Sequence, residues 1–273
     1  MSDAVTPPAA ASEAVLLEVA GGVATVTLNR PGAMNSLDIA TKVALRDAVT
    51  RIAGDPEVRC VVLTGTGRAF CVGQDLKEHV DLLDNGGSDA LFRTVPEHYN
   101  PIVTALATMP KPVVAAVNGV AAGAGASLAF ACDFRLLADT AGFNLAFSGI
   151  ALSCDTGSSW TLPRLVGRAK AIELLYEPRT IPAAESLELG LATRVVPAED
   201  LATEARTLAT RLASGPTAAY GAIRRSVAFS AGHGFEDSLT FEADMMTLTG
   251  STEDHRNAVA SFVAKQRPTF LGR

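Results

Sequence analysis

The stretch with the clearest capacity for chemistry is residues 111–132, where Gly123, Ala124 and Gly125 follow an apolar run. The β-branched residues of 112–117 predict a buried strand, and the residues after Gly125 predict a packed helix. The first N–H groups of a helix have no intrahelical acceptor, and glycines allow a ligand oxygen to approach them closely. The N–H of Ala124 is therefore a candidate donor of an oxyanion hole.

Two other interpretations of this stretch stay open on the residues alone. A dinucleotide-binding turn has the same order of strand, glycine-rich turn and helix. However, Leu128 stands where the third glycine of G-x-G-x-x-G belongs, and no acidic residue follows about twenty residues on. The alternative without a ligand is close packing of a helix on a strand.

The elements that must position this stretch form an α/β pattern. Residues 81–89 are polar and glycine-rich and predict a mobile loop, whereas 143–156 predict an irregular apolar segment. Strands in the front half and helices at the end indicate an α/β core with a helical C-terminal region. The predicted strands are 15–19, 23–28, 58–63, 112–117 and 133–138, and the predicted helices are 37–52, 95–108, 183–190, 198–213, 217–230, 235–249 and 252–265. In the helix at 37–52 the residues taken to face the core are Leu37, Ala40, Val43, Ala44, Ala48 and Ile52.

Composition restricts the possible partners. The chain has 273 residues, 48% hydrophobic and 19% charged, which suits one large domain, with or without a helical appendage. The net charge of −6 argues against nucleic acid as a general partner, because no basic stripe is available for phosphates. No apolar run reaches the length of a membrane span. Residues 1–12 lack a basic and an apolar region, so they predict a flexible tail rather than a signal peptide.

The cysteines and histidines indicate no metal or disulfide site. Cys60, Cys71, Cys132 and Cys154 form no C-x-x-C pair, and we expect free buried thiols in a reducing cytoplasm. The histidines lack metal-ligand spacing, and we expect all four at the surface: His79, His98, His233 and His255. No G-x-S-x-G elbow is present, which argues against a Ser-His-Asp hydrolase.

Several blocks in a fixed order resemble one family. They are N-R-P at 29–31, G-R-A-F-C-V-G-Q-D at 67–75, K-P-V-V-A-A-V-N-G-V-A-A-G-A-G-A-S-L-A at 111–129, C-D-F-R at 132–135, A-x-F at 141–143, L-P-R-x-V-G at 162–167 and A-E-S-L-E-L-G-L at 184–191. Together they are similar to the crotonase (enoyl-CoA hydratase/isomerase) superfamily over residues 13–270. The resemblance implies an α/β spiral of ββα repeats and a C-terminal helical trimerisation region. The expected division is a tail at 1–12, a core at 13–200 and a helical region at 201–273.

The resemblance also implies a ligand and a site. The partner is an acyl-CoA thioester, the assembly a homotrimer or a dimer of trimers, and no cofactor is expected because coenzyme A is part of the substrate. The N–H groups of Gln74 and Ala124 correspond to the two oxyanion donors. The other substrate-binding residues implied are Gly73, Asp75, Gly123, Gly125 and Phe147. Candidate cations for the phosphates of coenzyme A are Arg30, Lys77 and, from a neighbouring subunit, Lys265.

Two departures from the family concern its chemistry. The hydratases of the family carry two glutamates that hold and activate water, and at those positions this chain has Ser127 and Phe147. Neither side chain can act as a general base near neutral pH. Ordinary two-glutamate hydration is therefore not expected, although an enoyl-CoA hydratase of fatty-acid oxidation stays an alternative.

One carboxylate remains near these positions, Asp155, eight residues beyond Phe147. A single acid beside an enolate-stabilising hole can move a proton from one carbon to another, which is isomerisation. Apolar neighbours would raise its pKa toward the working range. The alternatives are an N-cap for a following helix and nucleophilic attack on an aromatic acyl-CoA, as in related dehalogenases.

The blocks at 99–101, 146–148 and 155–160 are similar to the ring-1,2-epoxyphenylacetyl-CoA isomerase (oxepin-CoA forming) subgroup of phenylacetate degradation. The resemblance makes Asp155 the catalytic acid/base. Cys154, Ser158 and Ser159 depart from that subgroup and flank this acid. We expect an acyl-CoA isomerase, and a non-catalytic acyl-CoA-binding member of the family stays open.

Overall fold

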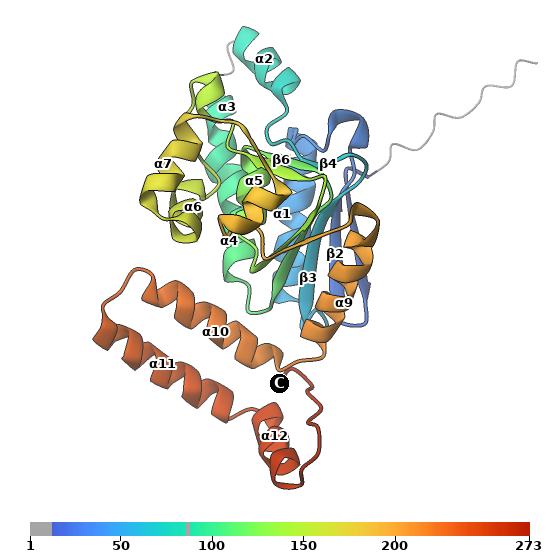
Figure 1. The fold of residues 1–273 in the computed structure, drawn as a ribbon, viewed down its shortest axis with the longest axis vertical. Helices are drawn as coiled ribbons and strands as arrows, with labels where there is room; N and C mark the ends of the chain where they lie inside the picture. Colours follow the sequence, from blue (N-terminus) through green and yellow to red (C-terminus); the bar gives the residue numbers. More distant parts are fainter. Residues whose placement is uncertain (1–12, 86–87) are drawn as a thin grey trace, which may run out of the picture.

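The structure, a computed structural model, describes residues 13–85 and 88–273. The predicted tail at 1–12 lies outside the described residues. The chain forms two sheets surrounded by helices, followed by a helical extension at the C-terminus (Figure 1).

Six strands form the larger sheet, and four short strands form the smaller one. In the order of pairing, the larger sheet contains β1 (Val15–Ala20), β2 (Val23–Leu28), β3 (Cys60–Gly65), β5 (Val113–Val117), β7 (Phe134–Ala138) and β10 (Arg194–Val196). The smaller sheet contains β4 (Ala69–Cys71), β6 (Val120–Ala122), β8 (Gly142–Asn144) and β9 (Thr180–Pro182). Strands β3, β5 and β7 lie in the larger sheet, and the strand after each one, β4, β6 or β8, lies in the smaller sheet. This alternation is the expected spiral of ββα repeats.

The helices complete each repeat and cover the sheets. Around the core they are α1 (Ile39–Gly54), α2 (Leu76–Asp84), α3 (Ser88–Thr94), the π-helical turn η2 (Val95–Tyr99), α4 (Asn100–Thr108), α5 (Ala124–Phe130), α6 (Ser158–Val166), α7 (Arg168–Tyr176) and α8 (Ala183–Glu188). The C-terminal part contains α9 (Leu201–Ala213), α10 (Thr217–Ser230), α11 (Phe235–Gly250) and α12 (Glu253–Val263). Short 3₁₀ turns are η1 (Pro31–Ala33), η3 (Ser148–Ile150) and η4 (Ala198–Asp200).

All five predicted strands are confirmed to within two residues, but some other predictions are wrong. The predicted loop at 81–89 is helical at 81–84 and again from Ser88, because Asp75 caps a helix whose polar residues face solvent. Helices α6 and α7 and the smaller sheet were not predicted. Three-residue strands such as β4 and β6 give no alternation for a sequence pattern to detect.

The buried face of α1 also differs from the prediction. Ile52 is buried as predicted, and Ala44 and Ala48 pack partly buried against the core. The structure also buries Thr41, Lys42, Leu45 and Val49, whereas Ala40 is exposed. The spacing of Lys42, Leu45, Val49 and Ile52 is that of one helical stripe. The first residue of this stripe is the charged Lys42, so a pattern of apolar residues alone does not include it.

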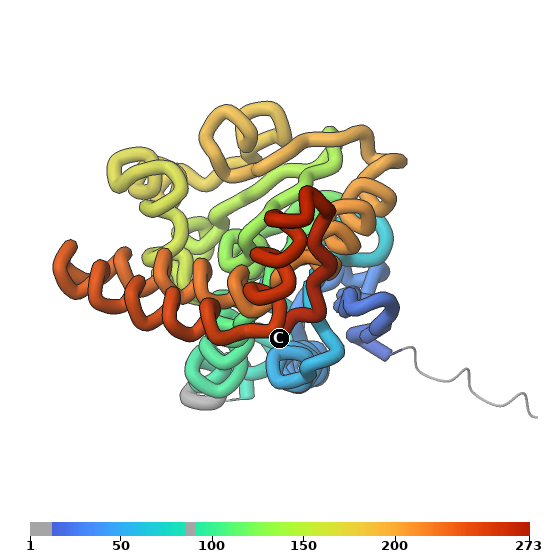
Figure 2. Tube along the Cα trace, turned by 90° about the horizontal axis from the view of Figure 1, so that it is seen from below, coloured from blue at the N-terminus to red at the C-terminus, as the bar shows by residue number. Residues whose placement is uncertain are grey.

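The C-terminal helices do not all pack in the same way. Helix α9 packs on β3, β5 and β7, so it covers the larger sheet although it follows residue 200. Helices α10 and α11 lie side by side and project from the core with α12 (Figures 1 and 2). We call α10–α12 the arm. A cavity of about 760 Å³ with apolar walls lies where α10 faces α4 and α6.

Two arginines attach the base of the arm to the core. The Arg224 guanidinium donates to the Leu106 and Lys111 carbonyls and pairs with Asp133 at 2.8 Å. Arg59 donates to the hydroxyl of Thr217, the first residue of α10, at 3.0 Å, and to the carbonyls of Gly215 and Phe270 on either side of the arm. Among the described helices, none combines the length and the apolar character needed to cross a membrane.

Candidate active site

A cavity of about 150 Å³ brings together residues that lie far apart in the sequence. Gln74, Gly123, Ala124, Phe147 and Asp155 all line it. The remaining walls are largely apolar and come from the segments 72–79, 91–99 and 146–152. Three of the residues singled out in the sequence for chemistry, Gln74, Ala124 and Asp155, therefore line one cavity.

Close packing beside this cavity requires glycine at two positions, Gly73 and Gly125. Gly73 has φ +84°, and a Cβ there would lie 2.9 Å from the Ala122 carbonyl oxygen and 3.2 Å from the Ala124 nitrogen. A Cβ on Gly125 would lie 2.1 Å from the Cys71 carbonyl oxygen. These close approaches bring the peptide of Gly73 and Gln74 against the start of α5.

The neighbouring peptides fix the direction of the Gln74 N–H. Leu37 donates its N–H to the Gly73 carbonyl at 2.8 Å, and Asp75 donates to the Leu37 carbonyl at 3.2 Å. The Gln74 N–H belongs to the same peptide as the Gly73 carbonyl, and in a trans peptide these two groups point in opposite directions. The Gln74 N–H therefore points away from Leu37, and no residue of 13–85 or 88–273 accepts a hydrogen bond from it. Ala124 begins α5, where an N–H has no intrahelical acceptor.

Asp155 enters the cavity from a strained turn. Thr156 has φ +51° and Gly157 has φ +79°, and Thr156 is a β-branched residue for which this conformation is costly. The Thr156 hydroxyl donates to the Asp155 carboxylate at 2.8 Å. Burial raises the pKa of Asp155, and the hydrogen bond from Thr156 only partly opposes this. The side chain makes no cap to α6, so the helix-cap alternative for Asp155 is wrong.

The two positions without a glutamate lie in different surroundings. Phe147 is buried and forms part of the cavity wall. Ser127 is fully buried behind that wall, where its hydroxyl donates to the Gly123 carbonyl at 3.0 Å and lies 2.5 Å from the hydroxyl of Ser158. The Ser127–Ser158 pair thus links α5 to the helix that follows Asp155.

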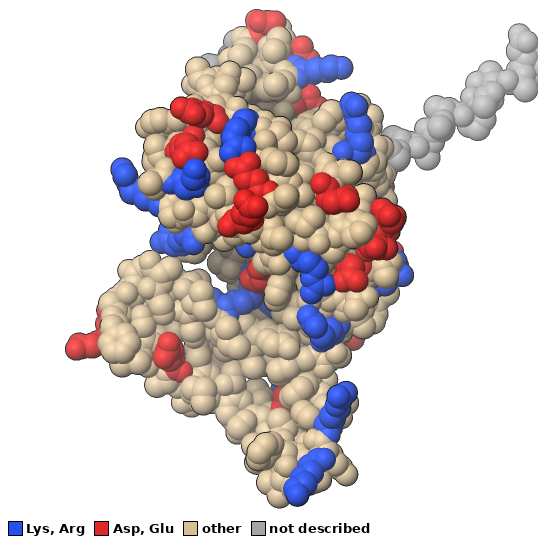
Figure 3. Space-filling model, viewed as in Figure 1, with Lys and Arg blue, Asp and Glu red and all other residues tan. Residues whose placement is uncertain are grey.

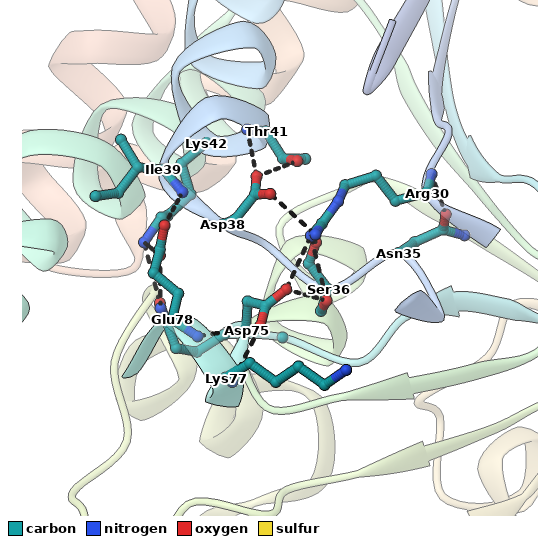
Figure 4. Close-up of polar contacts among 12 residues, drawn as sticks. Arg30, Asn35, Ser36, Asp38, Ile39, Thr41, Lys42, Asp75, Lys77 and Glu78 are labelled. Carbon is teal, nitrogen blue, oxygen red and sulfur yellow. Dashed lines mark hydrogen bonds and ion pairs between the residues drawn. The ribbon is translucent and has the colours of Figure 1, made fainter. Parts of the chain in front are cut away.

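Asp75 and Arg30 belong to a polar cluster beside the cavity (Figure 4). The Asp75 carboxylate accepts from the Ser36 hydroxyl at 2.9 Å and pairs with Arg30 at 3.1 Å, and it also caps α2. Burial by itself would raise the pKa of Asp75, but the hydrogen bonds from Ser36 and Arg30 hold it below its ordinary value. Arg30 pairs with Asp38 as well, at 2.9 Å. Both groups therefore anchor the loop that carries Gln74.

The other two candidate cations are placed differently. Lys77 is exposed, and its side chain extends away from the cluster in Figure 4. Lys265 follows α12, at the end of the arm, with φ +54°. Nothing within the described chain joins Lys265 to the cavity.

A buried polar network behind Gln74 was missed by the sequence analysis. Tyr99 donates its hydroxyl to Gln74 Oε1 at 2.6 Å, and Lys42 Nζ donates to the same atom at 3.2 Å. Lys42 Nζ also donates to the Thr94 hydroxyl at 2.8 Å. Tyr99 was noted only as part of a motif. Lys42 was detectable because it occupies the i, i+3, i+7 stripe of α1.

The predicted exposure is wrong for two of the four histidines, and the predicted burial is wrong for one of the four cysteines. His98 is buried, with Nδ1 3.2 Å from the Thr94 hydroxyl, because the π-helical turn points it inward. His79 is half-buried and lines the cavity, whereas His233 and His255 are exposed as expected. Cys60, Cys71 and Cys132 are buried, but Cys154 is only half-buried because it precedes the turn at Asp155.

Comparison with known proteins agrees with this architecture. The model of the family described as "Enoyl-CoA hydratase/isomerase" matches residues 18–273. The Escherichia coli (strain K12) protein named 1,2-epoxyphenylacetyl-CoA isomerase is 40% identical over 262 residues, which cover 96% of this chain and 99% of that protein. A Rhodobacter capsulatus protein named "Probable enoyl-CoA hydratase" is also 40% identical, over 94% of this chain and 97% of its own length.

Solved structures show the same fold. A Mycobacterium abscessus crystal structure, which carries a provisional assignment as an enoyl-CoA hydratase/isomerase, has a TM-score of 0.91 and 41% identity. The match covers 95% of this chain and all, 100%, of that one. With the alternating sheets and a family match over nearly the whole chain, this protein belongs to the enoyl-CoA hydratase/isomerase (crotonase) family.

Proposed function

We propose that this family member is an acyl-CoA isomerase that acts on an enoyl-CoA or an epoxyphenylacetyl-CoA-type thioester. The observation that carries the proposal is that Asp155 lines the same cavity as Gln74 and Ala124. The E. coli relative named 1,2-epoxyphenylacetyl-CoA isomerase supports the choice of substrate class.

In this mechanism the N–H groups of Gln74 and Ala124 donate to the thioester oxygen. Their dipoles stabilise the negative charge that develops there when a neighbouring carbon loses a proton. The Asp155 carboxylate takes that proton, and an enolate forms. Asp155 then returns the proton to a different carbon, and the thioester carbonyl is restored. The reaction needs no cofactor apart from the coenzyme A of the substrate.

The environment of Asp155 suits a group that must both accept and release a proton. Burial raises its pKa, so the protonated form lies closer in free energy to the carboxylate than in water. Ser127 and Phe147 offer no second general base, and Ser127 lies outside the cavity lining. These two positions favour isomerisation over hydration by two glutamates.

For coenzyme A we propose Lys77 as the main phosphate-binding cation of the same subunit, since Arg30 is engaged by Asp38 and Asp75. Lys265 would contribute from a neighbouring subunit. The arm supports self-association into a trimer or a dimer of trimers, because Phe235 and Phe262 are 78% and 83% exposed in the single chain. In the view of Figure 3 the arm shows few charged side chains. Sedimentation analysis of the purified protein tests the assembly.

The decisive experiment replaces Asp155 by Asn, which keeps the shape of the side chain and removes the base. Phenylacetyl-CoA and 3-hexenoyl-CoA are incubated in D₂O with each protein, and deuterium at the acyl carbons and the conjugated product are measured. We expect Asp155→Asn to lower both rates by about 10²–10⁴-fold while acyl-CoA binding persists. The matched control is Asp139→Asn, at an exposed carboxylate outside the cavity lining.

Each other outcome rejects a part of the proposal. Full activity of Asp155→Asn would remove Asp155 from the mechanism. Efficient addition of water to crotonyl-CoA without isomerisation would favour the hydratase alternative. Binding of the thioester without exchange in the unmodified protein would favour a non-catalytic acyl-CoA-binding protein.

A further inference from the structure

Lys42 is a buried cation that the proposed mechanism does not use. It is 1% exposed, and its ammonium group has three acceptors around it. Nζ donates to the Thr94 hydroxyl at 2.8 Å and to Gln74 Oε1 at 3.2 Å, and it lies 3.5 Å from the Glu78 carboxylate. An ammonium group has three hydrogens to donate, so this environment satisfies it fully. Burying a charge is costly, and the cost is tolerated only where such partners are built in.

These contacts converge on the side chain of Gln74. Gln74 Oε1 accepts from Lys42 and also from the Tyr99 hydroxyl at 2.6 Å. Gln74 Nε2 lies 3.5 Å from the Glu78 carboxylate. Both ends of the amide are therefore held, by partners from α1, α2 and η2. The Glu78 carboxylate in turn accepts from the Ile39 N–H at 2.9 Å, which ties α2 to the start of α1 (Figure 4).

The backbone of the same residue is held independently. The flanking groups, the Gly73 carbonyl and the Asp75 N–H, are both engaged by Leu37. With the side chain fixed on one side and the flanking peptides on the other, the Gln74 N–H has little rotational freedom. Oxyanion donors act through such preorganisation, because a donor already in place needs no reorganisation when charge develops.

We infer that Lys42, together with Tyr99, is a positioning residue that holds the Gln74 amide so that its backbone N–H meets the thioester oxygen. The inference deepens the proposed function and rests on it for the identity of the bound thioester. Lys42 itself does not line the cavity, whereas Tyr99 does. Lys42 acts through Gln74, and its loss should weaken carbonyl polarisation more than binding.

The experiment measures polarisation directly, without turnover. Phenylacetyl-CoA labelled with ¹³C at the thioester carbonyl is bound to the protein, and the infrared frequency of that carbonyl is recorded. In the unmodified protein we expect a shift to lower frequency relative to water. Lys42→Met should reduce this shift and lower kcat by about tenfold, with KM changed by less than about twofold.

Two matched variants separate positioning from general stability. Lys111 is also a buried lysine, but its Nζ donates at 2.8 Å to the carbonyls of Ile52 and Asp55, at the other end of α1. Lys111→Met should lower stability and leave the carbonyl frequency unchanged. Tyr99→Phe removes one hydroxyl from the network, and we expect the same change as for Lys42→Met but smaller. It provides the test if Lys42→Met does not fold.

A double-mutant cycle then tests whether Lys42 acts through the side chain of Gln74. In a Gln74→Met background, which keeps the backbone N–H, Lys42→Met should add little further change to the carbonyl frequency. Additive effects, or an unchanged frequency in both Lys42→Met and Tyr99→Phe, would overturn the inference. A wild-type carbonyl shift that Lys42→Met reduces, in a protein without isomerase activity, would retain the inference and reject the proposed function. The absence of any shift in the unmodified protein would overturn the inference itself.

Discussion

The two walls of the cavity are built on opposite principles. The wall at Gln74 and Ala124, to which we assign the two N–H donors, depends on the absence of side-chain atoms at the neighbouring Gly73. The wall at Asp155 presents a side chain on a strained turn and depends on the carboxylate that is present. The first wall should therefore be damaged by adding a carbon atom, and the second by removing or neutralising a polar group.

Apart from Asp155→Asn, the largest effect should come from adding one methyl group to the backbone wall. In Gly73→Ala the new Cβ would lie 2.9 Å from the Ala122 oxygen, and the residue would have to keep φ +84°. The peptide must move, and loss of a well-placed oxyanion donor costs about 10²–10³-fold in turnover. The measurement is the rate of α-proton exchange of phenylacetyl-CoA in D₂O.

Gly21→Ala is the control for this substitution. Gly21 has φ +57°, but no heavy atom lies within 4 Å of its Cβ position. That variant carries backbone strain without displacing the wall, so its exchange rate should match that of the unmodified protein. Equal rates for Gly73→Ala and Gly21→Ala would show that the wall tolerates the added atom and that the contrast between the walls is wrong.

A smaller effect is expected where the two walls are joined. Ser158→Ala removes one hydroxyl from the buried pair with Ser127, which links α5 to the helix after Asp155. Loss of a buried hydrogen bond should lower the free energy of unfolding by about 1–3 kcal/mol, as measured by urea denaturation. Ser230→Ala is the control, since Ser230 is exposed and bonds only to its own helix. An unchanged free energy of unfolding in Ser158→Ala would show that the Ser127–Ser158 hydrogen bond does not stabilise the fold.

The smallest effect is expected on the pH dependence of the free energy of unfolding, through the buried Asp155 carboxyl group. Because burial raises the pKa of Asp155, the folded state holds its proton to higher pH than the unfolded state does. Between those two pKa values the stability of the unmodified protein should fall as pH rises. Asp155→Asn cannot titrate, so it should become the more stable protein above this window, and the difference should fade as pH falls through it.

Urea denaturation of both proteins at a series of pH values measures this difference, with Asp139→Asn as a control of equal formal charge. A stability difference that grows toward low pH would mean that the Asp155 carboxylate is favoured by folding. The two walls would then not differ in the way proposed.

Prediction from the sequence succeeded where the information is contiguous. The strand at 112–117, the turn at Gly123 and the helix after it are confirmed, because neighbouring residues encode each of them. It was wrong where burial depends on a remote partner. Lys42 is a buried polar residue whose partner, the Thr94 hydroxyl, lies 52 residues away in the sequence. A polar side chain read alone is assigned to the surface.

The order of short motifs along the chain determined the family and the fold, and it brought Gln74, Ala124 and Asp155 forward as candidates. The resemblance also implied that Ser127 and Phe147 stand where hydratases carry glutamates. Only the tertiary structure decided that Asp155 shares a cavity with Gln74 and Ala124, that Ser127 pairs with Ser158, and that Lys42 and Tyr99 bond to the Gln74 side chain. The physical reason is that a motif records local backbone geometry, whereas burial and charge compensation arise from contacts between distant segments.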